Sequence, residues 1–163
     1  MESINLYAEA LLLRAAVERQ RGASTAQAAS WMEAYWREQG VSTKGMSIMD
    51  GSGLSPSNGM STRQMAKILY LASRKPYGIA LESSLPLAGR SGSLKSMLRG
   101  TAAEGKLRAK SGYISGARGY TGYVTTSNGK QLAFSMLANR YSCSAGAMRR
   151  KFETLMAKLA EGR

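Results

Sequence analysis

The chain has 163 residues, of which 44% are hydrophobic and 20% charged, and this balance is typical of one globular domain. Its 23 Lys and Arg residues outnumber the 10 Asp and Glu residues, and the net charge of +13 favours a polyanion as partner: nucleic acid, lipid headgroups or an acidic wall polymer. The chain has no His and a single Cys143, which excludes an internal disulfide, a Cys-based metal cluster and a histidine base, so any catalysis must use Lys, Ser, Tyr or carboxylates.

The first helix is predicted over residues 6–20. No basic region precedes an apolar core at this end, so no signal peptide is expected within the chain. The apolar run of residues 8–13 is also far shorter than the roughly 20 residues that cross a bilayer. One helical stripe should be buried, and it consists of Leu6, Ala10, Leu13 and Val17.

Two further helices are marked by capping boxes, in which a Ser precedes a Gln by three residues. Ser24 should begin a helix that ends at Gly40, with Trp31 and Tyr35 packing inward. Ser61 should begin another that runs to about Arg74. Between these helices lies a loop rich in Gly and Ser. Residues 77–105 should form short helical pieces, because Pro and Gly interrupt them repeatedly.

Beyond Gly105 the sequence alternates between apolar and polar residues, as strands do. Residues 107–114, 119–126 and 131–138 are predicted strands. Asn128-Gly129, between the last two, predicts a hairpin with a two-residue type I′ turn, because both residues tolerate positive φ.

The chain should close with an amphipathic helix over residues 144–160. Its apolar face consists of Met148, Phe152, Leu155, Met156 and Leu159. N-terminal helices, an antiparallel meander and a closing helix together predict an α+β fold, in a single domain over residues 1–163.

The triplet Lys110-Ser111-Gly112 is unusual for a strand. Alternation places Lys110 and Gly112 on one face of the sheet and Ser111 on the other. A Gly weakens a strand, and one reason to keep it is the close approach of a ligand or another backbone. Because Lys110 adds a cation, the triplet suits an edge strand that binds an extended peptide with an anionic end. The alternative is a solvated Lys beside a bulge Gly.

Ser3-Ile4-Asn5 stands directly before the first helix, where either Ser3 or Asn5 could be an N-cap. Together with the Lys-Ser-Gly triplet about a hundred residues later, however, it resembles the penicillin-recognising serine enzymes, whose motifs are S-x-x-K, S-x-N and K-T-G. The chain is similar to the C-terminal part of the D-alanyl-D-alanine carboxypeptidases of the penicillin-binding protein 4 type, the peptidase S13 family. Four stretches carry this resemblance in order: SINLYAEALL, DGSGLSPSNGMS, LPLAGRSGSL and GKLRAKSGYISGARGYTGYVTTSNGKQLAFSMLAN.

The resemblance implies the C-terminal portion of a β-lactamase/transpeptidase-like fold and a role for each motif residue. Ser3 would shuttle a proton toward the leaving group, and Asn5 would hold the substrate amide and the active-site lysine. Lys110 would tune the site and attract the substrate carboxylate, Ser111 would hydrogen-bond that carboxylate, and Gly112 would leave room for the substrate. A further family box, Asp50-Gly51-Ser52-Gly53, is interpreted as a loop that shapes the site or the core.

The activity implied is that of a serine-type hydrolase that cleaves peptidoglycan peptides ending in D-Ala-D-Ala through an acyl-enzyme, in the periplasm or elsewhere outside the cytoplasm. The full-length enzyme would also bind β-lactams, and no metal or organic cofactor is implied. The nucleophile should lie on an S-x-x-K helix upstream of Ser3. The one Ser-x-x-Lys within the chain, Ser127 to Lys130, contains the predicted turn and is dismissed as a nucleophile. These 163 residues are therefore expected to be inactive alone.

Two other expectations follow. Ser3, Asn5 and Lys110 should converge on one cleft, because they would act on one small substrate. Apolar surface left uncovered by the missing helix should make the chain associate with itself. The rival interpretation is a non-catalytic module that binds a muropeptide or an anionic polymer, with nucleic acid the least favoured because the basic residues are scattered.

Overall fold

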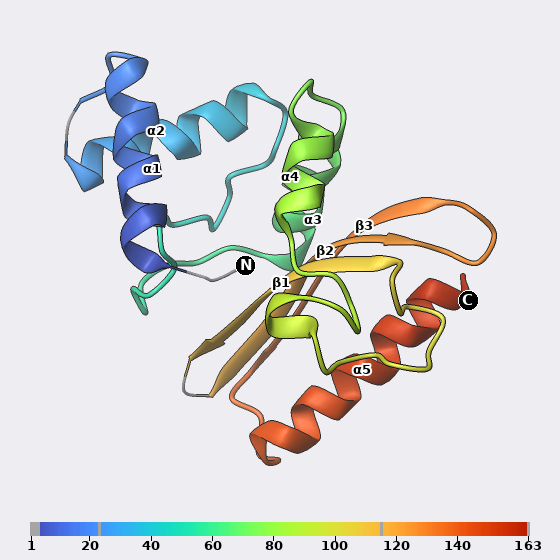
Figure 1. The fold of residues 1–163 in the computed structure, drawn as a ribbon. Coiled ribbons are helices and arrows are strands. Elements are labelled where there is room, and N and C mark those ends of the chain that lie inside the picture. Colours follow the sequence, from blue (N-terminus) through green and yellow to red (C-terminus); the bar gives the residue numbers. More distant parts are fainter. Residues whose placement is uncertain (1–3, 23, 115, 163) are drawn as a thin grey trace. The chain divides into compact units, whose positions relative to one another are not determined.

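The computed structural model describes residues 4–22, 24–114 and 116–162, and the chain forms two compact units (Figure 1). One unit comprises the described residues up to Gln64, and the other begins at Met65. No helix among the described residues is long and apolar enough to cross a bilayer.

The first unit is built on two packed helices, α1 (Asn5–Glu18) and α2 (Thr25–Glu38). Its small core contains Leu12, Ala16 and Ala28. The capping box of α2 is confirmed, because the Ser24 hydroxyl accepts a hydrogen bond from the Gln27 N–H and the Gln27 side chain accepts one from the Ser24 N–H. The predicted helix therefore begins at the expected residue.

The buried face of α1 differs from the predicted stripe. Leu12 and Ala16 are buried, whereas Leu6 is 71% exposed and Val17 48% exposed. The prediction was wrong because α1 is apolar around almost its whole circumference, so that the pattern alone does not fix which side packs. The helix buries the side with the small Ala16, which allows a close approach to α2.

Helix α3 (Thr62–Ser73) links the two units in sequence. Its capping box is confirmed as well, with reciprocal hydrogen bonds between Ser61 and Gln64. The broken segment that follows contains a short helix and a 3₁₀ turn, as expected. These elements are α4 (Gly78–Ser84) and η1 (Gly92–Leu94).

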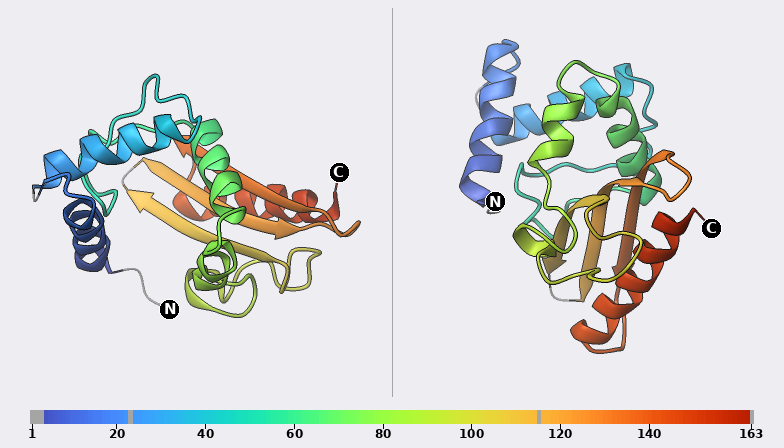
Figure 2. Two further views of the ribbon diagram at one scale, coloured as in Figure 1. Left: turned by 90° about the horizontal axis from the view of Figure 1, so that it is seen from above. Right: turned by 45° about the vertical axis from the view of Figure 1, so that its right-hand side comes forward.

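The second unit contains an antiparallel sheet of three strands in the order β1-β2-β3. The strands are β1 (Leu107–Ile114), β2 (Ala117–Thr125) and β3 (Gln131–Asn139), close to the predicted ranges. Helix α5 (Ala145–Glu161) lies along one face of the sheet (Figures 1 and 2). The core between them includes Leu94, Leu107, Ala109, Tyr120, Val124, Phe134, Phe152 and Met156. The α+β fold is thereby confirmed.

One residue of the predicted apolar face of α5 is not buried. Leu155 is 52% exposed, whereas Phe152 and Met156 on either side of it are at most 5% exposed. The buried residues of α5, Phe152, Met156 and Ala160, recur every four residues, and Leu155 lies at the edge of the stripe that they form.

The β2–β3 hairpin turns at Asn128-Gly129, but not through the predicted type I′ turn. Of these two residues only Gly129 has a positive φ, of 80°, whereas a type I′ turn requires both. The Gly129 N–H donates to the Thr126 carbonyl at 2.9 Å, and Thr126 pairs with Lys130. The hairpin loop is therefore longer than two residues: a tight turn that begins at Thr126 is followed by Gly129 in the left-handed conformation. Hydrogen bonds from Ser127 to the Ala160 carbonyl of α5 hold it in this form.

Candidate functional site

Strand β1 is the outermost strand of the sheet, and part of its outer edge is open. Near its start the edge is closed, because the Ala109 N–H donates to the Pro86 carbonyl at 3.0 Å. Outward-facing backbone groups recur at every second residue of an antiparallel strand, so Ser111 and Tyr113 also face outward. No strand in the described part of the chain pairs with them. The edge is therefore open over residues 111–113.

Lys110 places its ammonium at this open edge. Its Nζ donates a hydrogen bond to the outward-facing carbonyl of Ser111 at 2.6 Å. Partial burial lowers the pKa of Lys110, because removing water from an ammonium disfavours its charged form. An anion at the edge would stabilise the charged ammonium in place of the removed water, so the surroundings of Lys110 favour the binding of a carboxylate.

Ser111 faces the opposite side of the strand and bonds to a residue that the sequence did not single out. Its hydroxyl lies 2.8 Å from the hydroxyl of Ser93 in η1. The turn that carries Ser93 is itself held in place, because the Ser91 hydroxyl accepts a hydrogen bond from the Leu87 N–H at 2.9 Å. The Ser111 hydroxyl donates this bond, which fixes its orientation. Because a hydroxyl can donate one hydrogen bond and accept two, Ser111 can donate to a ligand only if the bond reverses and Ser93 becomes the donor. The signal was present in the stretch LPLAGRSGSL, which contains Ser93.

Gly112 has open space where a side chain would stand. A Cβ added there meets no atom within 4 Å, and the φ of Gly112 is not positive. By contrast, a Cβ on Gly122 of β2 would lie 2.0 Å from the Arg108 carbonyl oxygen. Packing therefore requires a glycine at 122, whereas neither packing nor backbone conformation requires one at 112.

The family box at residues 50–53 is anchored to α1 by a carboxylate. Glu9 accepts hydrogen bonds from the N–H groups of Gly51, at 2.9 Å, and Ser52, at 3.0 Å. The pKa of Glu9 is lowered, chiefly by a hydrogen bond from the Ser52 side chain and further by these two backbone bonds. Gly51 is needed here, because a Cβ on it would lie 2.6 Å from the Ala8 carbonyl oxygen.

Asp50 closes the same loop on itself. Burial acts to raise its pKa, but hydrogen bonds from the Asn58 side chain and from the N–H groups of Ser55 and Gly53 outweigh it, so the pKa is lowered. The two backbone bonds are each 2.6 Å long. The residues of this box therefore hold a loop in shape, in line with the interpretation from the sequence.

The remaining predicted site residues are placed as follows. Ser3 lies outside the described residues. Asn5 is the first residue of α1, whose N-cap is Ile4 without a side-chain cap, and it belongs to the first unit, whereas Lys110 belongs to the second. The convergence of Ser3, Asn5 and Lys110 thus stays a prediction. Ser127 lies in the hairpin loop, and its hydroxyl donates to the Ala160 carbonyl at 3.2 Å.

Comparison with known proteins finds relatives over most of the chain. The model of the D-Ala-D-Ala carboxypeptidase 3 (S13) family matches residues 1–161. A D-alanyl-D-alanine carboxypeptidase from an Actinomadura species is 38% identical over 74% of the chain and 24% of its own length. The carboxypeptidase DacB of Mycolicibacterium smegmatis is 32% identical over 85% of the chain and 31% of its own length. The chain thus spans about a quarter to a third of these relatives.

Solved structures show the same fold. Penicillin binding protein 4 of Haemophilus influenzae, at 24% identity, superimposes with a TM-score of 0.84 over 98% of the chain and 37% of its own. The same protein complexed with a β-lactam has a TM-score of 0.82, at 23% identity, over 97% of the chain and 38% of its own. The TLA-3 extended-spectrum β-lactamase, at 15% identity, reaches 0.62 over 85% of the chain and 54% of its own.

Proposed function

Because the chain belongs to the D-Ala-D-Ala carboxypeptidase 3 (S13) family, we propose that it provides the substrate-binding strand of a serine-type D-Ala-D-Ala carboxypeptidase or endopeptidase. The substrate would be a peptidoglycan peptide that ends in D-Ala-D-Ala, and the reaction would take place outside the cytoplasm. In this proposal residues 1–163 are one part of a larger penicillin-binding, transpeptidase-like domain.

The observation that carries the proposal is the open edge of β1 at residues 111–113. A peptide added there in extended form would pair with the outward-facing N–H and C=O groups of Ser111 and Tyr113. Its terminal carboxylate would take the ammonium of Lys110 from the Ser111 carbonyl. It would also accept a hydrogen bond from the Ser111 hydroxyl, which would then accept from Ser93 instead of donating to it. The space beside Gly112 would receive the substrate backbone.

Chemistry at this edge requires a nucleophile from elsewhere. In the acyl-enzyme mechanism a serine attacks the peptide carbonyl, D-Ala leaves with a proton, and water then hydrolyses the ester. We assign the proton transfer to Ser3 and the orientation of the substrate amide to Asn5, and the attacking serine to an S-x-x-K segment outside the 163 residues. A β-lactam would acylate that same serine.

A titration of the chain with two peptides tests the proposal. One peptide ends in D-Ala-D-Ala with a free carboxylate, and the other is its terminal amide. The free acid should bind more tightly than the amide, because a charge-assisted hydrogen bond to Lys110 or Ser111 contributes about 1.5–3 kcal/mol, or more than tenfold in affinity.

The variants Ser111→Ala and Ser127→Ala separate the site from the rest of the sheet. Ser111→Ala removes one of the two groups that would hold the carboxylate, so it should reduce the preference for the free acid while Lys110 retains the rest. Ser127→Ala, in the hairpin loop, is the matched control and should retain it. Equal binding of acid and amide by the unmodified chain would contradict the proposal.

A further inference from the structure

The net positive charge of the chain belongs to one of its two units. Residues 1–64 contain 6 Lys and Arg residues and 6 Asp and Glu residues, so their net charge is zero. Residues 65–163 contain 17 Lys and Arg residues but only 4 acidic residues, so this part carries the entire +13. An even distribution would have given both parts a positive charge. Electrostatic attraction of a polyanion would therefore act mainly on the second unit.

The acidic residues of the second unit leave most of its cations without a counter-charge. Glu153 pairs with Arg149 at 2.8 Å. Glu104 accepts a hydrogen bond from the Gly100 N–H, and Glu82 accepts one from the Gln131 side chain. Three of the four carboxylates are thus occupied locally, two of them by uncharged groups.

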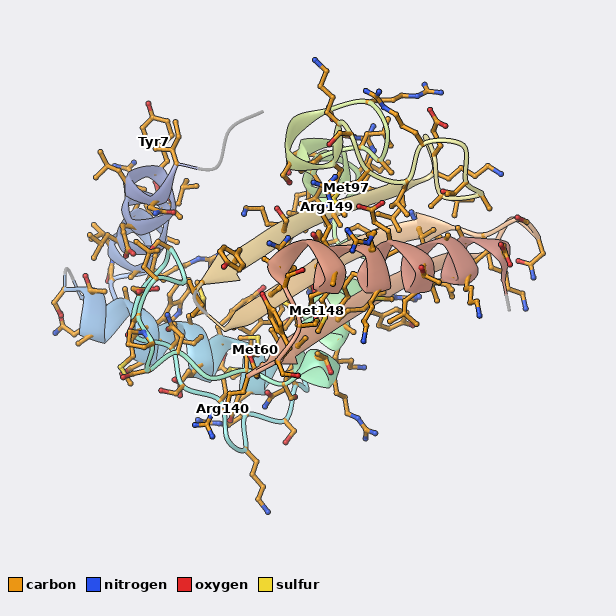
Figure 3. The ribbon with its side chains drawn as sticks, turned by 90° about the horizontal axis from the view of Figure 1, so that it is seen from below. Tyr7, Met60, Met97, Arg140, Met148 and Arg149 are labelled. Atoms are coloured by element: carbon orange, nitrogen blue, oxygen red, sulfur yellow. The ribbon has the colours of Figure 1, made fainter. Side chains whose placement is uncertain are left out.

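Three of the cations gather where α5 meets the segment after η1, and a fourth follows them on α5. The Arg149 guanidinium donates to the Ser96 hydroxyl at 3.1 Å, which brings the start of α5 against this segment, and Figure 3 shows Arg149 beside Met97. Lys95 and Arg99 flank Ser96 on one turn, since the Arg99 side chain donates to the Lys95 carbonyl at 3.1 Å. Arg150 follows Arg149 on α5 and is exposed, as are Lys95 and Arg99. We call these four residues, Lys95, Arg99, Arg149 and Arg150, the basic cluster.

We infer that the basic cluster binds a linear phosphate-bearing polymer, independently of the open edge of β1. A membrane surface fits less well, because Leu155 is the one exposed large apolar side chain on the described part of α5 and residues 90–106 expose none. Nucleic acid fits less well too, because the exposed aromatic residues of the second unit, Tyr70, Tyr77 and Tyr113, lie outside both segments and could not stack bases there. Among the described residues, the cluster offers cations without an apolar surface or an aromatic ring beside them, so we assign to it a flexible chain of phosphate charges.

Binding of fluorescently labelled inorganic polyphosphate, followed by anisotropy over a range of salt concentrations, tests this inference. The test variant carries Lys95→Glu, Arg99→Glu and Arg150→Glu, and it spares Arg149 because of the ion pair with Glu153. The control variant carries Arg19→Glu, Lys44→Glu and Arg63→Glu, three exposed positions in the neutral unit, so both variants have the same net charge. Thermal unfolding of both variants establishes that they fold.

The unmodified chain and the control should bind alike, whereas the test variant should bind at least about tenfold more weakly. Its slope of log K against log salt should be shallower by about two, since each phosphate contact with a single strand contributes about 0.7. Equal weakening of both variants, or of neither, would overturn the inference. So would anionic vesicles that bind the chain without competition from polyphosphate, or an oligonucleotide that displaces polyphosphate of equal charge at much lower concentration.

Discussion

The substitution Gly112→Ala separates a glycine kept for a ligand from one kept for the fold. The added methyl group meets no atom within 4 Å, and the backbone φ is not positive, so the folded chain accommodates it without strain. Because alanine restricts the unfolded chain more than glycine does, the free energy of unfolding should be unchanged or rise by about 0.4–1 kcal/mol. For a unit of about this size that corresponds to a rise in Tm of a few degrees.

Peptide binding should change in the opposite direction. The methyl group occupies the space that we assign to the substrate backbone, so a peptide ending in D-Ala-D-Ala should lose about tenfold or more in affinity, equivalent to about 1.4 kcal/mol. Gly122→Ala is the matched control on the neighbouring strand. Its Cβ would lie 2.0 Å from the Arg108 carbonyl oxygen and 2.7 Å from the Ala109 Cα, so it should destabilise the chain by about 1–3 kcal/mol or more.

Urea unfolding measures the first quantity and a peptide titration the second. The reasoning is refuted if Gly112→Ala destabilises the chain as Gly122→Ala does, because Gly112 would then serve packing. It is also refuted if Gly112→Ala binds the peptide as well as the unmodified chain does.

Four further predictions concern the nucleophile, the hydroxyl pair, the loop and the exposed helix face. Intact mass should show no covalent adduct after incubation of these 163 residues with penicillin, and an adduct abolished by Ser127→Ala would overturn the dismissal of that serine. Ser93→Ala should weaken binding of the peptide acid about fivefold, for a hydrogen bond worth about 1 kcal/mol, and leave binding of the amide unchanged. Ser93→Thr should restore the affinity for the acid. Equal losses for acid and amide would argue against a role of Ser93 in positioning Ser111. Folding lowers the pKa of Glu9 from 4.5, so its ionised carboxylate stabilises the folded chain. In urea unfolding, the stability lost in Glu9→Gln should be constant above about pH 4.5 and shrink as the pH falls below it. A loss that does not vary with pH would contradict the anchoring of the loop by the ionised carboxylate. Sedimentation at micromolar concentration should show a dimer or larger species that Leu11→Glu dissociates, since Leu11 is 70% exposed; a purely monomeric boundary for the unmodified chain would contradict it.

Local signals in the sequence predicted the fold well where a short-range contact determines the structure. The capping boxes at Ser24 and Ser61 placed two helix starts correctly, because the bonds that define a cap join residues three apart. The hairpin at Asn128-Gly129 was also found, but its turn type was not. Ser127 bonds to the end of α5, and this contact with residues more than thirty positions away does not appear in a turn propensity.

The site was predicted in part for the same reason. Alternation and composition identified the triplet at Lys110, but the open edge beside it depends on where residues 86–88 stop pairing with β1. The contribution of Ser93 depends on a contact eighteen residues away. The buried side of α1 was missed because its apolar residues surround the helix, so the choice was left to packing against α2.

Amide hydrogen exchange, resolved by residue, tests most directly that a peptide pairs with the open edge of β1. In the free chain the N–H groups of Lys110 and Gly112 face β2 and should be protected, whereas those of Ser111 and Tyr113 face outward and should exchange fast. A saturating peptide ending in D-Ala-D-Ala should slow exchange at Ser111 and Tyr113 and leave the two inward-facing amides as they were. If exchange at Ser111 and Tyr113 is unchanged while the peptide is bound, the peptide binds elsewhere and the account is contradicted.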